Sequence, residues 1–311
     1  MHHSSLVTCH SSLVSHHSSL LSRMKRLIIN ADDFGFTRGV NNGIVQAHKQ
    51  GIVTSTTIMA NGQAFNEAVE LARENPGLGV GCHLSIVGGR PVAPATQIRS
   101  LLESDGSLPP TWTRLALKLT RRAVPPEQIV IEFRAQLERI TRCGIKLTHV
   151  DTHKHSHTHP QVMKALAIAA GEFGIKCVRN PFENVFARVG LAGVANWSFV
   201  KQSALSAAIQ PSVIQFKRVI RKAGFETPNR FFGVKLTGML DSMAIRSMME
   251  APWEGTAELM CHPGIYDEEL EQARTRLKRE RERELEALCD PSLRLIAERH
   301  GIELIDYRGL C

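Results

Sequence analysis

The chain has 311 residues, of which 43% are hydrophobic and 22% charged, and no stretch approaches the roughly 18 consecutive apolar residues that a membrane span needs. Such a length suits one large domain or two ordinary ones. The net charge is +8, but the positive residues are dispersed, aromatic residues are only 5%, and no zinc-finger or RNP-type motif is present, so we expect no nucleic-acid partner.

The first 23 residues have the composition of a low-complexity extension. Three copies of one seven-residue unit, HHSSLVT, CHSSLVS and HHSSLLS, run from His2 to Ser22. The unit lacks the charged start and apolar centre of a secretory signal, and it lacks the apolar seam of a coiled coil. We therefore expect residues 1–23 to lie outside the fold and one domain to span residues 24–311.

From Met24 onward, β-rich segments alternate with segments of helical periodicity. The expected strands are RLIIN, VTSTTIMA, LGVGCHLSIV, KLTHVD, IKCVRN, RFFGVKL, AELMCH and IELIDY. The expected helices are GVNNGIVQAHKQG, residues 64–74, 124–143, 161–173, 241–249 and 267–288, and a shorter helix ending at residue 300. This alternation predicts parallel βαβ units in an α/β fold.

The number of these units favours a barrel over an open sheet. No G-x-G-x-x-G follows the first strand, so a dinucleotide-binding fold is not indicated. We expect a single distorted, TIM-like β/α barrel of about seven strands. Residues 88–126 and 181–229 interrupt the alternation, and we expect them to be long insertions that build the pocket.

Polar side chains follow four separate expected strands at the point where each one ends. On a β/α barrel these ends meet on one face, and chemistry takes place there. Two adjacent acids after an apolar strand are costly to desolvate unless a cation satisfies them. A helix cap, a core histidine or a turn would explain each residue singly, but four coincidences would be needed. The residues are Asp32, Asp33, His83, Asp151, His153 and His262.

The stretch THKHSHTHP places histidines on alternate positions. In extended backbone, alternate residues share a face but lie nearly 7 Å apart, so one or two of these histidines can reach a single ion. We expect His153, nearest the strand end, to be a ligand. His155 and His157 are expected to support the ligands or contact substrate, and His159 to belong to the turn before Pro160.

The segments RLIINADDFGFTRGVNNGIVQAHKQGIVTSTTIM, GVGCHLSIVGGRPV and THVDTHKHSHTHP resemble the YdjC-like carbohydrate deacetylases, also called the ChbG/HpnK family. The forms GRPV and HKHSHTHP are most similar to the HpnK branch, which is associated with hopanoid lipid biosynthesis. The resemblance implies a metal-dependent hydrolase that removes N-acetyl groups from amino sugars on a β/α barrel. It also implies a homodimer.

Carried over by motif, the resemblance makes Asp33, His83 and His153 the ligands of one divalent ion. Two histidines and one carboxylate do not identify the ion: Mg²⁺ or Zn²⁺ is expected first, and iron and others stay open. Asp32 would be the general base, and the histidine of CHPG, His262, would lie near the substrate.

An ion can polarise an amide carbonyl and lower the pKa of bound water. We expect His262 to protonate the departing amine and Asp151 to orient a neighbouring histidine. Arg179, in IKCVRN, completes the expected substrate-binding or supporting set, and the substrate is an N-acetylated amino sugar or glycolipid.

Two other functions stay open. A glycosidase would use Asp32 and Asp33 as its acid pair, although adjacent residues do not naturally flank a glycosidic bond. A non-catalytic barrel would bind metal or sugar without turnover.

Two basic segments bear on the surroundings of the protein. The segment SFVKQSALSAAIQPSVIQFKRVIRKAGF could form a lid helix with a solvated basic face, or a helix that contacts an anionic membrane. The run RTRLKRERERELEAL is expected to be a solvated helix surface.

The seven cysteines are scattered without a C-x-x-C pair, which is typical of a reducing compartment. We therefore expect a cytoplasmic protein, with peripheral contact to the inner face of the membrane as an option.

Overall fold

The computed structural model describes residues 24–183, 200, 203–204, 206–207 and 209–310. The prediction for residues 1–23 and part of the insertion at 181–229 therefore lie outside the described residues. None of the helices in the described ranges combines the length and apolar character that crossing a membrane requires.

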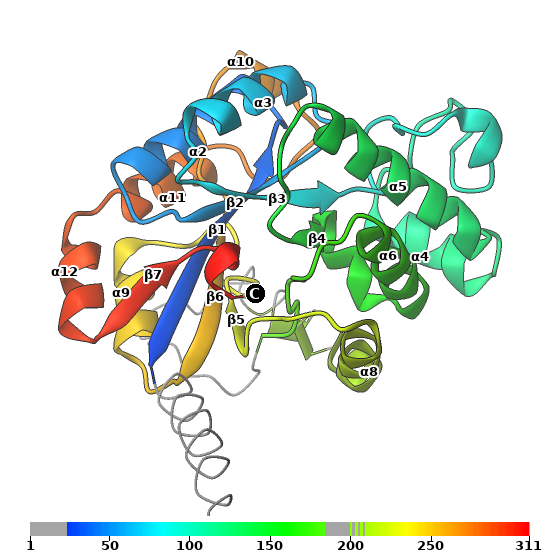
Figure 1. The fold of residues 1–311 in the computed structure, drawn as a ribbon. Coiled ribbons are helices and arrows are strands. Elements are labelled where there is room, and N and C mark those ends of the chain that lie inside the picture. The colour runs from blue at the N-terminus through cyan, green and yellow to red at the C-terminus, as the bar shows by residue number, and fades with distance from the viewer. Residues whose placement is uncertain (1–23, 184–199, 201–202, 205, 208, 311) are drawn as a thin grey trace, which may run out of the picture.

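The centre of the fold is a curled, entirely parallel sheet, as Figure 1 shows. Its strand order is β4-β3-β2-β1-β6-β5, and β7 pairs with β1. The strands are β1 (Lys25–Phe34), β2 (Ser55–Ile58), β3 (Gly79–Leu84), β4 (Val150–Thr152), β5 (Arg230–Phe232), β6 (Gly255–Cys261) and β7 (Ile302–Ile305). The predicted distorted β/α barrel is confirmed.

Helices surround this sheet (Figure 1). They are α2 (Arg38–Lys49), α3 (Phe65–Glu74), α4 (Trp112–Thr120), α5 (Pro126–Arg142), α6 (Pro160–Glu172), α8 (Val213–Ala223), α9 (Ser242–Glu250), α10 (Glu268–Gln272), α11 (Glu280–Leu288) and α12 (Ser292–Arg299). Local chemistry explains several starts: Thr37 caps α2 by accepting from Val40 N, and α6 has Pro160 in its first turn after the His159 cap.

The first strand has no solvent-facing side. Leu27, Ile28 and Ile29 are all fully buried, as expected for a parallel strand covered on both faces. Helix α2 packs closely on the loop after β6: a Cβ on Gly43 would lie 2.4 Å from Gly264 Cα. Only a glycine at position 43 allows this approach, which fixes the loop that follows β6 at the carboxyl end of the sheet.

Several predicted elements were wrong in extent. KLTHVD is a strand only at its end, because β4 begins at Val150. Most of IKCVRN forms no strand, and Cys177 and Val178 make only isolated bridges. RFFGVKL stops at Phe232, because Gly233 has a φ of 117°. The expected helix over residues 267–288 is two helices, α10 and α11. Residues 273–279 separate them, beginning with the extended backbone of Ala273.

Candidate functional site

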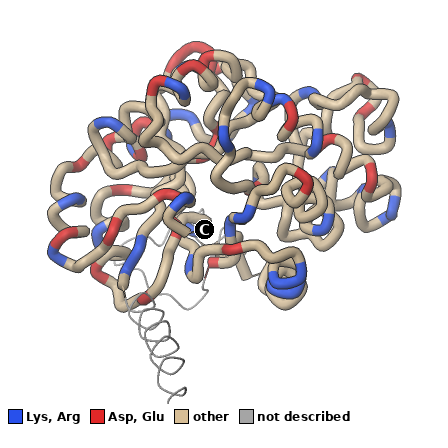
Figure 2. Tube along the Cα trace, viewed as in Figure 1, with Lys and Arg blue, Asp and Glu red and all other residues tan. Residues whose placement is uncertain are grey.

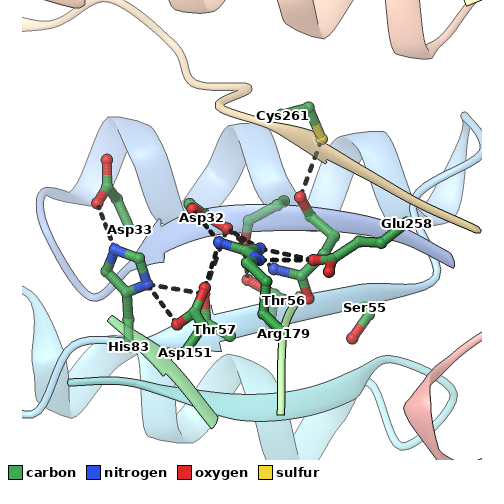
Figure 3. Close-up of polar contacts among 12 residues, drawn as sticks. Asp32, Asp33, Ser55, Thr56, Thr57, His83, Asp151, Arg179, Glu258 and Cys261 are labelled. Carbon is green, nitrogen blue, oxygen red and sulfur yellow. Dashed lines mark hydrogen bonds and ion pairs between the residues drawn. The ribbon is translucent and has the colours of Figure 1, made fainter. Parts of the chain in front are cut away.

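The site lies beyond the carboxyl ends of β1, β3, β4 and β6. The parallel register places His83 of β3 directly beside Asp151 of β4. Asp32 and Asp33 come from the end of β1, where the pairing with β2 becomes irregular. Figure 3 shows these four side chains pointing toward one another. The strand order therefore brings together residues that lie more than a hundred positions apart in the sequence.

Three predicted ligands converge on one point. Asp33 Oδ1 lies 3.2 Å from His153 Nδ1 and 3.5 Å from His83 Nε2, and the two histidine nitrogens are 3.2 Å apart. Asp33 has a φ of 72°, a left-handed conformation that is uncommon for a residue other than glycine. Such backbone strain is concentrated at functional sites, and here it turns the carboxylate toward the histidines.

This donor set suits a divalent ion. Ligands about 2.1 Å from one ion lie about 3.0 Å apart at right angles and about 3.4 Å apart in a tetrahedron. Two of the observed separations, both 3.2 Å, fall in that range, and the third, 3.5 Å, exceeds its upper end by only about 0.1 Å. Asp33, His83 and His153 can therefore hold a metal through one oxygen and two nitrogens.

Asp151 fixes the orientation of His83. The Nδ1 of His83 donates to Asp151 Oδ1 at 2.6 Å, so its Nε2 faces Asp33 and His153. A carboxylate behind a histidine is the usual support for a metal-binding imidazole. Burial alone would lower the pKa of His83, but Asp151 and the neighbouring carboxylates offset it and raise that pKa to about 9. Burial lowers the pKa of His153.

Arg179 is the fully buried cation behind the site. Its guanidinium donates two hydrogen bonds to Asp32, at 2.6 and 2.7 Å, and also contacts Asp151 and Glu258 (Figure 3). Asp32, His83 and Asp151 also lie close enough together to hold an ion. Because Arg179 already forms ion pairs with both carboxylates of that second set, the set with Asp33 and His153 is the better candidate metal site.

The predicted base Asp32 is buried and firmly held. Burial would raise its pKa, but Arg179 offsets this and holds the pKa of Asp32 well below its usual range. Asn30 Nδ2 donates a further hydrogen bond to Asp32 Oδ1 at 3.0 Å. Asp32 is therefore a fixed carboxylate beside the candidate metal ligands.

The histidine run does not have the extended backbone that was predicted. Residues His153–Thr158 form a 3-10 turn, with Lys154 and His155 in the left-handed region. The cause is local: Thr152 Oγ1 accepts from His157 N at 3.0 Å and bonds its Nδ1 at 2.6 Å, which curls the chain. Alternate histidines therefore do not share one face.

The remaining histidines of the run have different surroundings. His155 packs edge-on against Phe231, and His157 lies against Phe216 of α8. Burial and Arg179 together lower the pKa of His157 to about 3, so it is neutral. His159, which was predicted to lie in the turn before Pro160, is the N-cap of α6, and its side chain accepts from Gln161 N.

His262 lies just beyond β6, next to β1 in the sheet. Its backbone N donates to Glu284 Oε2 at 2.6 Å, and its Nδ1 is 3.8 Å from the same oxygen. The side chain is 11% exposed. This histidine is therefore held close enough to Asp32 to help lower the pKa of that carboxyl, and a small part of its side chain is exposed.

The prediction of a solvated charged helix was wrong for two residues of α11. Arg281 and Glu284 are each 1% exposed. Arg281 Nη2 donates to Asp33 Oδ2 at 2.5 Å. The Glu284 carboxylate accepts hydrogen bonds from the backbone N–H groups of His262 and Gly238. Nothing in the alternating charges of this segment distinguishes the two inward residues, because tertiary packing alone buries them.

Glu258 and Tyr307 were also missed. Tyr307 OH donates to Glu258 Oε2 at 2.6 Å, and Glu258 accepts from Arg179 Nε at 2.8 Å. Burial raises the pKa of Glu258 to about 7, against the opposing effect of Arg179. A signal was available here, since Glu258 is a lone charge inside the apolar strand AELM and needed a buried partner.

The fold and the site together define a distorted β/α barrel with a candidate metal centre at the carboxyl ends of its strands, and comparison with known proteins agrees with this class. Residues 26–299 match the family described as YdjC-like protein, and the chain belongs to that family. A carbohydrate deacetylase of Brevibacillus brevis is 34% identical over 92% of this chain and 99% of its own length. A carbohydrate deacetylase of Vibrio vulnificus is 33% identical over 92% of this chain and 96% of its own length.

A solved structure has the same fold. The crystal structure of an Enterococcus faecalis protein, described as a proposed cellobiose-phosphate cleavage protein, superposes with a TM-score of 0.75 and 25% identity. The match covers 93% of this chain and 99% of that one.

Proposed function

We propose that this chain is a metal-dependent carbohydrate deacetylase, which hydrolyses the N-acetyl amide of an amino sugar. The relatives named carbohydrate deacetylases match nearly the whole chain. The observation that carries the proposal is the convergence of Asp33, His83 and His153 at separations of 3.2–3.5 Å. One divalent ion is the proposed cofactor, Mg²⁺ or Zn²⁺.

A divalent ion, when bound, would polarise the acetyl carbonyl and lower the pKa of water in the site. The protein supplies the geometry. Asp151 holds His83 so that Nε2 faces Asp33 and His153, and the left-handed backbone of Asp33 turns Oδ1 to the same point, where these groups would hold an ion. His153 completes the set from the turn after β4.

Asp32 is the proposed general base. Arg179 keeps Asp32 ionised and orients it, so the carboxylate is always available to accept a proton. The lowered pKa of Asp32 makes it a weak base. A weak base would suffice here, because a bound ion would lower the pKa of the water that gives up the proton.

His262 is the proposed general acid that protonates the departing amine. Glu284 fixes the backbone of His262 and lies 3.8 Å from its ring. Asp151 is proposed to orient His83, and Arg179 is proposed to orient Asp32. His155 and His157 are proposed to contact substrate or the groups that support the ligands.

Within this class, we propose a lipid-linked amino sugar as substrate, of the N-acetylglucosaminyl hopanoid type. The support is helix α8, where Figure 2 shows Lys and Arg gathered. Phe216 and Ile220 of α8 are buried, while Ile214 is 73% exposed beside a basic surface hollow. The basic residues of this hollow are Lys217, Arg218, Arg221 and Lys222. Such a face suits a peripheral contact with the anionic inner face of a membrane in the cytoplasm.

The family resemblance also supports a homodimer.

The interpretation of α8 as a lid is compatible with the membrane contact. Its buried face packs on His157 near the site, and its basic face is exposed. Flotation with anionic and neutral liposomes tests the contact: K217E/R221E should abolish binding to anionic vesicles, and unchanged flotation would refute it.

The glycosidase alternative is weaker than the deacetylase. A glycosidase needs one carboxyl group with a raised pKa to serve as acid. The pKa values of both Asp32 and Asp33 are lowered, because Arg179 and Arg281 more than offset the effect of burial. A non-catalytic barrel has no use for a fixed carboxylate adjacent to the metal set.

The test is release of acetate from an N-acetylglucosamine disaccharide and from a lipid-linked N-acetylglucosamine. We expect release that chelator abolishes and added divalent metal restores, and loss of release in H153A. Chelator-resistant turnover, or cleavage of the glycosidic bond, would refute the proposal.

A further inference from the structure

Arg281 of α11 is a buried cation in direct contact with one proposed metal ligand. Its Nη2 donates to Asp33 Oδ2 at 2.5 Å. The other oxygen, Asp33 Oδ1, is the one that lies 3.2 Å from His153 Nδ1. The two oxygens of one carboxylate therefore have different partners, a guanidinium on one side and the metal-binding histidines on the other.

Contacts that stabilise the fold explain the placement of Arg281 only in part, among them the approach of its guanidinium to 5.8 Å from the centre of the Phe36 ring. The side chain is 1% exposed, and its Nη1 has no hydrogen-bond partner among the described residues although it is buried. Its Nε makes only a 3.3 Å bond to Leu277 O. Burying a guanidinium with an unmet donor is unfavourable, so a salt bridge kept only for folding would be better satisfied.

We propose that Arg281 is a positioning residue that restrains Asp33 to ligation through one oxygen and weakens the hold of the site on its ion. This inference rests on the proposed metal-dependent function. Occupation of Oδ2 prevents the carboxylate from binding an ion through both oxygens, which leaves coordination positions for water and substrate. The nearby positive charge also repels a divalent cation.

Removing the guanidinium ends both the restraint on Asp33 and the repulsion of the cation, and each change should increase the affinity for the metal. In Arg281→Met, Asp33 gains freedom to bind through both oxygens and the repulsion disappears. We expect the metal-stripped variant to bind Mn²⁺ about tenfold or more tightly than the wild type. We expect its kcat for acetate release to fall about tenfold or more, because a second oxygen occupies a position that the reaction needs.

A residue that only supports the fold would behave differently. Its loss would leave Asp33 disordered, and Mn²⁺ would bind more weakly. The sign of the change in metal affinity, measured by isothermal titration calorimetry, therefore separates the two roles independently of turnover.

Arg283 provides a matched control on the same helix, since its side chain is 67% exposed and pairs only at 3.7 Å with Glu280. R283M should leave both the Mn²⁺ affinity and kcat unchanged. If circular dichroism shows that R281M does not fold, R281Q is measured by the same criteria.

Mn²⁺ affinity that is weaker than or equal to that of the wild type would overturn the inference, as would tighter binding with undiminished kcat. Failure of the wild type itself to bind Mn²⁺ is a separate result, which would refute the proposed metal centre.

Discussion

Glu258 makes the stability of this protein depend on pH in a direction opposite to that of most carboxylates. It is fully buried on β6, with Arg179 and Tyr307 as partners. Burial raises its pKa from 4.5 to about 7 despite the opposing Arg179. The folded protein therefore holds this proton more tightly than the unfolded chain, and its contribution to stability is complete below about pH 4.5 and is lost as the pH rises to about 7.

A shift of this size corresponds to about 3 kcal/mol, at 1.36 kcal/mol for each pKa unit. Glu258→Gln removes the titration while preserving the size of the side chain and its ability to bond Arg179 and Tyr307. The free energy of unfolding of the variant, minus that of the wild type, should rise by about 3 kcal/mol between pH 4.5 and pH 8.

Urea unfolding of the metal-stripped proteins, followed by circular dichroism across this pH range, measures the difference. E303Q, at an exposed position on β7, should give a difference that does not change with pH. A difference for E258Q that is flat or decreases with pH would refute the reasoning.

Three further outcomes follow from the same structure. Asp33→Asn removes the anionic donor of the metal set, and calorimetry should show Mn²⁺ affinity reduced at least about 100-fold, with the fold retained by circular dichroism. Arg179→Met leaves the carboxylates around it buried without their cation, so urea unfolding should show a loss of about 3–5 kcal/mol or no folded protein; wild-type stability would contradict this. Gly43→Ala puts a Cβ 2.4 Å from Gly264 Cα, so Tm should fall by several degrees in a thermal melt and kcat should decrease as the loop carrying His262 shifts.

The parallel barrel and the meeting of its polar strand ends could be predicted because topology alone imposes them. Once β1, β3, β4 and β6 are parallel neighbours or near neighbours, residues that follow them must share one end of the sheet. That is why Asp33, His83 and His153, which were predicted as metal ligands from separate segments of the sequence, lie together in the structure.

The histidine run could not be predicted, because alternation does not fix backbone conformation. A hydrogen bond that His157 N donates to the side chain of Thr152 turns a segment expected to be extended into a tight turn. His153 nevertheless reaches the site, since it is the first residue after β4 and precedes the turn's left-handed residues.

Arg281 could not be found either, for a different reason. Its helix shows the alternating charges of a solvated surface, and only the packing of α11 against the loops after β1 and β6 buries it. Glu258 is the opposite case, because one acid within an apolar strand indicates a buried cation even before the cation is known.

Anomalous diffraction from crystals soaked in Zn²⁺ tests the central claim most directly. We expect one strong peak about 2.0–2.3 Å from Asp33 Oδ1, His83 Nε2 and His153 Nδ1 together. A peak bound by Asp32 and Asp151 with Arg179 displaced, or no peak near these side chains at saturating Zn²⁺, would contradict the account.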